Sequence, residues 1–332
     1  MKTKIAKILK FLFPFVLGGG ILWWMYRDFP FSTLDDVLLE DMHWEWMVLS
    51  FIPGILAQVF RGLRWHQALE PLEEHPHRRN CVLAVYISYA ASLLVPRIGE
   101  VTRCGVLKRQ DGISFSKSLG TVVTERIVDS LLVLLMVGGV LLWQLPVVLR
   151  FFNLTGVGLR EMTDRFTSTG IIVTIICLLC IVGVAVVVLQ KISVSNKLKD
   201  TLSGMWTGIM SLRKVRNVPL YLFYSVGIWV AYFLHYYLTF FCFDSTAQLG
   251  LTAGLVSFCI GTIAVIVPTP NGAGSWHFAV KTILVLYGLG QMDAVVFVLI
   301  VHGIQTLLII LLGIYALLAL QYRRPPALHG NG

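Results

Sequence analysis

A half-length apolar segment that ends in a charged break constrains the fold more than any other feature of this chain. The segment covers residues 82–95, and the sequence PRIGEVTR, from Pro96 to Arg103, follows it directly. A helix needs about 20 apolar residues to cross a bilayer, so this segment is too short. Charged, irregular backbone at membrane depth is tolerated only inside protein or along a wet cavity. The pattern predicts a hairpin that enters the membrane and returns to the same side. A cytoplasmic loop after a short buried helix is the alternative.

Composition places the chain among helical membrane proteins. Of its 332 residues, 56% are hydrophobic and 14% are charged, whereas a soluble domain carries about 25% charged residues. The net charge is +9, but the basic residues cluster beside apolar segments, which indicates membrane orientation and anionic lipid head groups rather than nucleic acid. We therefore expect an all-α polytopic fold. Residues 1–324 would form a single transmembrane domain, and residues 325–332 a short cytoplasmic tail.

Hydropathy and basic flanks predict about six full spans plus two broken or re-entrant hairpins. The full spans are expected at residues 11–26, 46–63, 115–148, 170–189, 219–243 and 293–320. Lysines precede the first span and arginines follow the last one, so both termini are expected in the cytoplasm. At the end of the second span, Arg64 is expected to extend toward the membrane surface, with Trp65 at the interface.

The flanks of the short apolar segment favour re-entry over crossing. Arg78 and Arg79 precede it, and Lys108 and Arg109 follow the charged break. A true crossing would place one basic flank outside the cell, whereas a hairpin keeps both flanks in the cytoplasm. The charge pattern therefore supports a cytoplasmic re-entrant hairpin.

A second break lies in the last third of the chain. Apolar runs at residues 251–267 and 276–289 are joined by PTPNGAGS, from Pro268 to Ser275. Two prolines and two glycines in eight residues cannot continue a helix. The two runs form either two crossings or a hairpin from the outer face. In the second case the chain resembles inverted-repeat transporters, whose broken helices meet near the midplane. The inverted repeat is a hypothesis, because no residue-level repeat is visible.

The first break carries a group of charges suited to a phosphate. Arg97, Glu100 and Arg103 are spaced three apart and would share one helix face. Two cations around one anion at a helix N-terminus leave a net positive surface that suits a phosphate group. A self-satisfied Arg–Glu–Arg ladder is the alternative, and all three remain candidate substrate-binding residues.

A second charged group lies in the predicted third span. Glu125 and Asp129 are four residues apart, and Arg126 can pair with Asp129. Glu125 then needs another partner, and Arg97 and Arg103 are the nearest candidates in sequence. A structural ion network is the favoured interpretation. Contact with a substrate head group is the alternative, so Glu125, Arg126 and Asp129 are also candidate substrate-binding residues.

The second break offers backbone groups rather than charges. Ser275 is expected to cap the helix that follows, while Gly272 and Gly274 allow close backbone approach. Free amides beside Asn271 predict an anion cradle. His277 falls in the first helical turn, where a structural role is commoner than a functional one. All five are kept as candidate substrate-binding residues.

Together these motifs resemble the membrane region of lysylphosphatidylglycerol synthases and its stand-alone, flippase-like relatives. The matching pieces are RGLRW at residues 61–65, PRIGEVTR at 96–103, ERIVD at 125–129 and PTPNGAG at 268–274. The resemblance covers residues 5–320. It implies an all-α protein of the bacterial inner membrane that moves or handles lipids, such as aminoacylated phospholipids or polyprenyl-linked glycolipids. It also implies membrane lipids with anionic head groups as partners, with a separate lipid-modifying enzyme as a further candidate partner.

The sequence departs from the family pattern in two places. Asn271 replaces one glycine of the second loop, and His277 stands where the family has a glutamate. Any role of that carboxylate is therefore not carried over. The aminoacyl-transferase domain of the synthases is not expected after Arg324, so lysine transfer is not expected either.

The leading hypothesis is a lipid transporter of the flippase or scramblase type, not an enzyme. Arg97, Arg103 and the loop at residues 271–275 would hold the head group, with the tails left in lipid. No nucleotide-binding loop is present, and we expect no cofactor and no metal. One alternative is an intramembrane enzyme that acts on lipid-linked sugars through Asp35 and Asp36. Another is an accessory subunit of a lipid-modifying complex.

Overall fold

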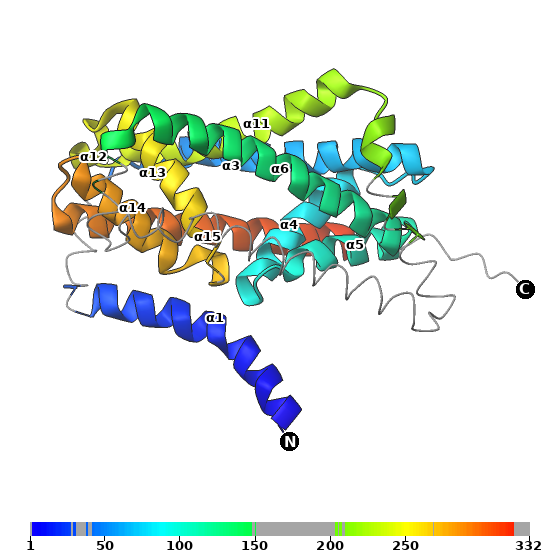
Figure 1. Cartoon of the computed structure of the whole chain (residues 1–332), viewed down its shortest axis with the longest axis horizontal. Coiled ribbons are helices and arrows are strands. Elements are labelled where there is room, and N and C mark those ends of the chain that lie inside the picture. The colour runs from blue at the N-terminus through cyan, green and yellow to red at the C-terminus, as the bar shows by residue number, and fades with distance from the viewer. Residues whose placement is uncertain are drawn as a thin grey trace, which may run out of the picture.

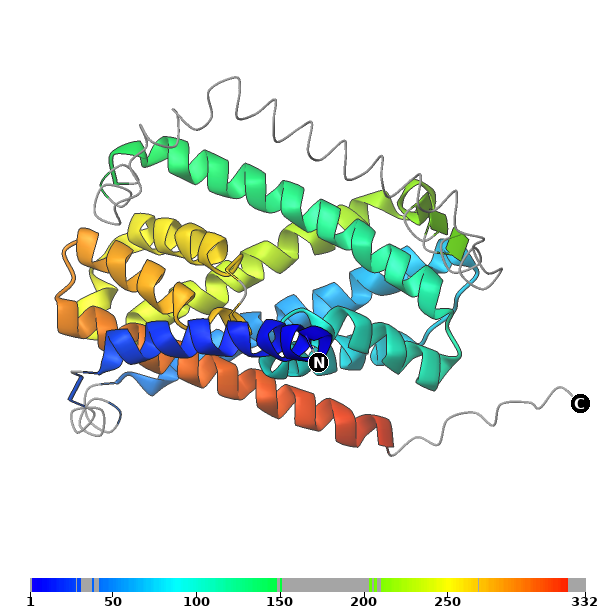
Figure 2. The ribbon, with the colours of Figure 1, turned by 60° about the horizontal axis from the view of Figure 1, so that its bottom comes forward.

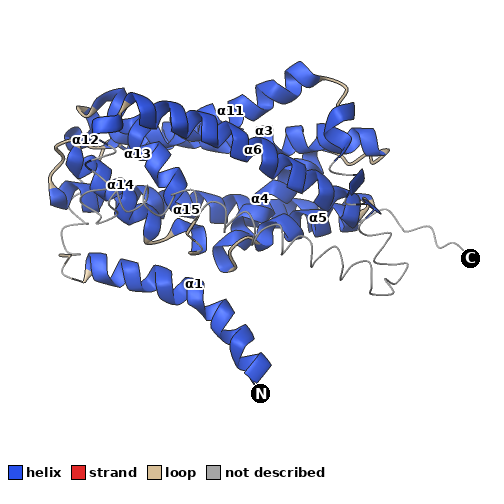
Figure 3. Cartoon of the chain, in the orientation of Figure 1, coloured by secondary structure: helices blue, strands red, loops and turns tan. Residues whose placement is uncertain are grey.

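The computed structural model describes residues 2–27, 29–30, 38, 42–147, 150, 203–204, 206–207, 210–267 and 269–321. Within these residues the chain is all-α and contains no strand, as predicted (Figure 3). Three expectations lie outside the described residues: the span at 170–189, the acidic pair Asp35 and Asp36, and the tail at 325–332.

Five long helices form the framework of the molecule (Figure 1). They are α1 (Lys2–Tyr26), α3 (Trp44–Leu69), α6 (Phe115–Trp143), α11 (Val218–Tyr237) and α15 (Gln291–Gln321). Three described segments are long and apolar enough to cross a membrane: Trp44–Leu72, Val218–Cys242 and Gln291–Gln321. In addition, α1 and α6 have 25 and 29 residues, which is more than the roughly 20 that a crossing requires. Five of the six expected full spans are therefore observed as helices.

The first predicted hairpin is present as two short, packed helices. They are α4 (Arg78–Leu94) and α5 (Ile98–Asp111), which lie against each other along their lengths. At 1.5 Å per residue, each is shorter than the roughly 30 Å hydrocarbon core. The chain turns between them at Pro96 and Arg97, and Gly112 ends α5 in a left-handed conformation with φ 71°.

The second break also forms a hairpin of two short helices, which favours re-entry over two full crossings. Its helices are α13 (Gly250–Ala264) and α14 (Ser275–Leu286), and the single turn η5 (Pro270–Gly272) lies between them. The two helices pack against each other, and with 15 and 12 residues both are too short to cross a bilayer of ordinary thickness.

The two halves of the described chain repeat one order of elements in opposite directions. A long helix, a hairpin and a second long helix follow each other as α3, α4–α5, α6 and again as α11, α13–α14, α15. The first helices of the halves, α3 and α11, are antiparallel neighbours. Near one end His235 contacts the carbonyl oxygen of Ser50, and near the other Arg64 donates to Ser225. The order and direction of the elements support the inverted-repeat hypothesis.

The tips of the two hairpins approach each other near the middle of α15. His302 and Thr306, at the middle of this helix, contact Asn271 in the second hairpin. About two turns beyond Thr306, Gly313 faces Ala90 of α4. The turn η5 also contacts α4 directly. With 31 residues, α15 is about 46 Å long, so the tips meet far from both of its ends.

The remaining helices enclose this meeting point. The helix α6 contacts α5 of the first hairpin and α13 of the second, and α1 lies against α14 and η5 (Figure 2). One apolar cluster, around Met47, Phe240 and Phe297, joins α3 to the second half. Another, around Trp65 and Leu107, joins α3 to the first hairpin. Outward-facing leucines on α6 leave an apolar surface, as lipid contact requires.

Candidate functional site

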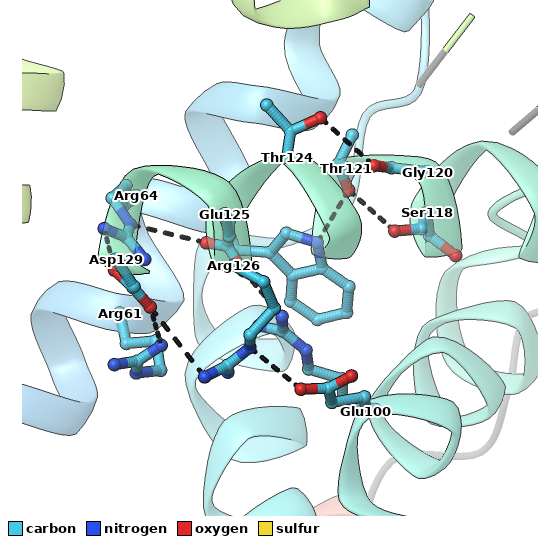
Figure 4. Close-up of polar contacts among 12 residues, drawn as sticks. Arg61, Arg64, Glu100, Ser118, Gly120, Thr121, Thr124, Glu125, Arg126 and Asp129 are labelled. Atoms are coloured by element: carbon cyan, nitrogen blue, oxygen red, sulfur yellow. Dashed lines mark hydrogen bonds and ion pairs between the residues drawn. The ribbon is translucent and has the colours of Figure 1, made fainter. Parts of the chain in front are cut away.

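A buried group of ion pairs fixes the first hairpin to α3 and α6 (Figure 4). We call it the arginine–carboxylate network. Its members are Arg61 and Arg64 of α3, Glu100 and Arg103 of α5, and Glu125, Arg126 and Asp129 of α6.

Arg103 and Glu125 form the centre of this network. The Nη2 atom of Arg103 lies 2.6 Å from Oε2 of Glu125, and the two side chains are 2% and 0% exposed. The guanidinium of Arg103 also lies over the ring of Trp65, 4.5 Å from its centroid, and Trp65 in turn donates to Thr121 over 2.9 Å. The expectation that Arg103 is a nearby partner of Glu125 is confirmed.

Asp129 forms ion pairs with both arginines of α3. Arg61 and Arg64 each place an Nη1 atom 2.7 Å from one of its carboxylate oxygens. Arg64 also lies 3.5 Å from Glu125 and donates to Ser225 of α11. The prediction that Arg64 reaches the membrane surface was wrong, because carboxylates of α6 hold this side chain in the interior.

Trp65 is likewise buried rather than interfacial. It is enclosed between the guanidinium of Arg103 and the hydroxyl of Thr121. An indole needs a hydrogen-bond acceptor when it leaves water, and Thr121 supplies one inside the bundle.

The outer edge of the network is half exposed. Arg126 lies 2.8 Å from Glu100, with side-chain exposures of 44% and 39%, but 3.9 Å from Asp129. The expected partner of Arg126 was Asp129, and the hairpin instead brings Glu100 closer. The alternative of a self-satisfied ladder along α5 is therefore wrong, since Glu100 and Arg103 both pair across to α6.

The network carries one net positive charge, because four arginines face three carboxylates. Three of the arginines also retain buried N–H groups that lack a hydrogen-bond acceptor among the described residues, namely Nε of Arg61, Nη2 of Arg64, and Nε and Nη1 of Arg103. Unpaired buried donors are costly. The surplus of charge and donors favours an anion over a cation near this site.

Arg97 differs from every member of the network. It precedes α5 with φ 65°, in the left-handed region, and its side chain is exposed. Within the described part of the chain it forms no hydrogen bond or ion pair. A non-glycine residue in this conformation costs on the order of 1 kcal/mol or more. The structure thus holds a free cation in a strained position at the tip of the first hairpin.

At the tip of the second hairpin, Asn271 connects the loop to α15. It also has a left-handed backbone, with φ 52°, which asparagine tolerates better than most residues. Its side-chain Nδ2 donates to Thr306 over 2.9 Å, and its carbonyl oxygen accepts from Nε2 of His302 over 3.1 Å.

Three backbone amides of this loop already have acceptors, so Gly272 and Gly274 offer no free amide to the predicted anion cradle. The amide of Gly272 donates to the carbonyl of Thr269 over 3.2 Å, and that of Ala273 to Pro270 over 2.8 Å. The amide of Gly274 donates to Nδ1 of His277 over 3.3 Å. The tight turn satisfies its own amides because the chain reverses within a few residues.

The helix cap also differs from the prediction. Gly274, with φ 87°, is the residue before α14, and Ser275 is the first helical residue. The hydroxyl of Ser275 donates back to Gly272 over 3.2 Å instead of capping. His277 lies in the first turn as expected. It is buried, and its ring centroid lies 4.4 Å from that of His302 on α15.

The structure thus separates the candidate residues into two groups. Arg97, Glu100, Arg103, Glu125, Arg126 and Asp129 belong to the first hairpin and its partners, whereas Asn271, Gly272, Gly274, Ser275 and His277 form the second tip. Arg61 and Arg64 were not among the candidates. Their spacing of three on an apolar helix places both on one face, and this signal could have identified them as a pair.

The comparisons with known proteins give one match. A family model described as "Lysylphosphatidylglycerol synthase TM region" matches residues 11–313. No curated protein and no solved structure matches the chain.

Proposed function

Because the chain belongs to the lysylphosphatidylglycerol synthase transmembrane-region family, it is an integral membrane protein related to lipid handling, and we propose that it transports lipid. In this proposal it acts as a flippase or scramblase for an anionic phospholipid or a polyprenyl-linked lipid in a bacterial inner membrane. Both termini face the cytoplasm, and no chemical step is involved.

The observation that carries this proposal is the free cation at the first tip. Arg97 is exposed and unpaired in the described structure, next to a network with one net positive charge. The neighbouring pair of Arg126 and Glu100 is half exposed. Exposed ion pairs are worth at most about 1 kcal/mol, so Arg126 can leave Glu100 and join Arg97 on a phosphate.

The buried pairs have a different task in this proposal. Arg103, Glu125 and Asp129 are nearly inaccessible, so a head group cannot reach them without disruption of the hairpin. The pair of Arg103 and Glu125 holds α5 against α6 and thereby positions Arg97 and Glu100, whereas Asp129 holds α3 against α6. The acyl or polyprenyl tail stays outside, along apolar faces such as that of Leu131, Leu134 and Leu135 on α6.

Reconstituted vesicles test the proposal. The purified protein is placed in liposomes with a fluorescent anionic phospholipid or a fluorescent polyprenyl phosphate, and the fraction moved between leaflets is measured with an impermeant quencher. We expect movement with the unchanged protein and a loss of at least roughly tenfold with Arg97→Gly, since one phosphate contact by arginine is worth about 1.5–3 kcal/mol.

Arg79→Ala is the matched control, because Arg79 is an exposed arginine at the opposite end of α4. It should transport normally. Vesicles in which neither lipid moves, or in which both variants behave alike, would contradict the proposal. Consumption of a lipid-linked sugar without movement would favour the enzyme alternative instead.

A further inference from the structure

The two hairpins are attached to their long helices by different chemistry. In the first half, Arg103 of α5 forms an ion pair with Glu125 of α6. In the second half, His277 of α14 faces His302 of α15. Glu125 is the eleventh residue of α6 and His302 the twelfth of α15, so the two pairs occupy matching places in the repeat. At this place an ion pair joins the first hairpin to its long helix, whereas two imidazoles meet in the second half, beside apolar contacts of Val280 and Leu284.

The hydrogen bonds assign His277 to the neutral form and locate one proton on the ring of His302. Nε2 of His302 lies 3.1 Å from the carbonyl oxygen of Asn271, which can only accept, so this nitrogen carries the proton. The amide of Gly274 donates to Nδ1 of His277, so that nitrogen carries none. Nδ1 of His302, in turn, lies 3.5 Å from the hydroxyl of Thr306.

The surroundings offer no anion to a protonated ring. Tyr26 of α1 meets His277 edge-on, with centroids 6.0 Å apart, and a phenol brings no negative charge at neutral pH. The other titratable or charged side chains on the helices packed around the pair are Cys259 of α13, Lys281 of α14, Asp293 and Tyr315 of α15, Arg78, Arg79, Cys81, Tyr86 and Tyr89 of α4, and Lys2, Lys4, Lys7 and Lys10 in the N-terminal part of α1, which Arg27 follows. Among the described residues, no carboxylate forms an ion pair with either imidazole.

We propose that His277 and His302 form a proton-binding site that releases the tip of the second hairpin from α15. A proton on Nδ1 of His277 removes the acceptor of the Gly274 amide. It also places a cation beside the second imidazole and at a helix N-terminus, where the dipole opposes it. The contacts that can yield are those of Asn271 with His302 and Thr306, since they alone tie this loop to α15 by hydrogen bonds in the described structure.

The two hairpins therefore respond differently to a proton. The first hairpin stays fixed by its buried ion pairs, and the second moves when a proton binds. Only the coupling of this movement to lipid transport rests on the proposed function. The proton site itself can be tested without any transport measurement.

Cysteine accessibility tests the proton site directly. Ala273 lies in the loop and is partly buried. In full-length protein whose six cysteines are replaced by serine or alanine, Ala273→Cys is labelled with a maleimide in detergent. Its rate is divided by that of Gln291→Cys, at an exposed position, which removes the pH dependence of the thiol chemistry. We expect this ratio to rise at least roughly fivefold from about pH 8 to about pH 5, the range in which histidine titrates.

Two glutamine variants and one control make the test specific. His277→Gln keeps an acceptor for the Gly274 amide, as in a capping box, and His302→Gln keeps a donor for Asn271. Neither side chain titrates, so each should give a ratio that is low and independent of pH. His235→Gln is the matched control, because His235 is a partly buried histidine of α11 that contacts Ser50 and, among the described residues, lies against no other imidazole. It should keep the full response.

A pH-independent ratio in the unchanged histidine background would overturn the proposal, as would loss of the response in His235→Gln. In liposomes, an imposed pH gradient should alter lipid movement by the unchanged protein but not by His277→Gln or His302→Gln. If no lipid moves under any gradient, the transport function fails while the labelling result still decides the proton site.

Discussion

At the scale of single residues, one short motif contains two arginines with opposite environments. Arg97 is exposed and strained, whereas Arg103, six residues later, is buried against Trp65 and Glu125. The difference arises because Arg97 lies on the turn and Arg103 lies one and a half turns into α5, on the face that meets α6. A residue that recruits a ligand and a residue that holds the fold can thus share a motif.

Arg97→Gly is expected to separate function from stability. Glycine accepts the left-handed backbone without the strain that arginine carries, so the melting temperature in detergent should stay constant or rise. Lipid movement should fall, because the free cation is lost. Arg97→Ala should also lose movement but leave the melting temperature close to that of the unchanged protein, since alanine retains the strain that arginine already carries. A fall in stability with glycine would contradict the assigned backbone conformation.

Glu125→Gln should strongly destabilise the protein. It leaves the buried guanidinium of Arg103 without its countercharge, and loss of one partner of a buried pair costs about 3–5 kcal/mol. Glu100→Gln is the matched control, because the pair of Glu100 and Arg126 is half exposed and should cost at most about 1 kcal/mol. Thermal or denaturant unfolding in detergent checks both. Equal losses of stability in the two variants would show that burial does not determine how much each ion pair contributes to stability.

At the scale of elements, the first hairpin depends on close contact between its two helices. A Cβ atom on Gly99 of α5 would collide with the backbone carbonyl of Ser88 and the hydroxyl of Ser92, both on α4. The absence of a side chain at this position lets α5 approach α4 at the end nearest the turn. The tip that carries Arg97 is therefore positioned by backbone contact as well as by ion pairs.

Gly99→Ala is expected to loosen the hairpin. The added methyl group meets backbone that cannot rotate away, and overpacking of this kind costs about 1–3 kcal/mol. Gly105→Ala, in the same helix, has open space around it and should stabilise α5 by about 0.5–1 kcal/mol. Proteolysis or unfolding in detergent measures the two changes. A stabilising effect at Gly99 would show that α4 and α5 are farther apart than described.

At the scale of the whole molecule, two antiparallel halves bring two broken elements together at the middle of α15. Broken helices that meet inside a membrane protein are typical of transporters built from inverted repeats. Here the halves differ in chemistry, with charged pairs at one tip and imidazole and amide groups at the other. The symmetry lies in the order of helices and not in the residues that occupy them.

The inverted arrangement predicts opposite accessibility of the two tips. In sealed inside-out and right-side-out vesicles, Ile98→Cys should react with an impermeant maleimide from the cytoplasmic side, and Ala273→Cys from the outer side. Both substitutions are made in the cysteine-free background, and Gln291→Cys reports the outer side. Labelling of both tips from one side would contradict the arrangement.

The class of the protein, its long helices and the positions of both breaks could be predicted from the sequence. These features depend on local quantities: the length of an apolar run, the placement of basic residues, and the inability of proline and glycine to continue a helix. The partner of Glu125 could be narrowed to Arg97 or Arg103, because few cations lay near in sequence, but the choice of Arg103 needed the fold.

Which polar groups are free depends on contacts that form only when the helices pack. Arg64 and Asp129 are 65 positions apart, and α3 must pack on α6 before the two can meet. In the second loop, the amides of Gly272 and Ala273 donate to carbonyl oxygens of the same turn, and composition does not specify this turn geometry. His277 faces His302, which lies on another helix, so the position of His277 in the sequence does not reveal this pair. Burial and pairing depend on contacts between residues that lie far apart in the sequence. The fold therefore decides whether a polar residue is exposed or buried, and paired or unpaired.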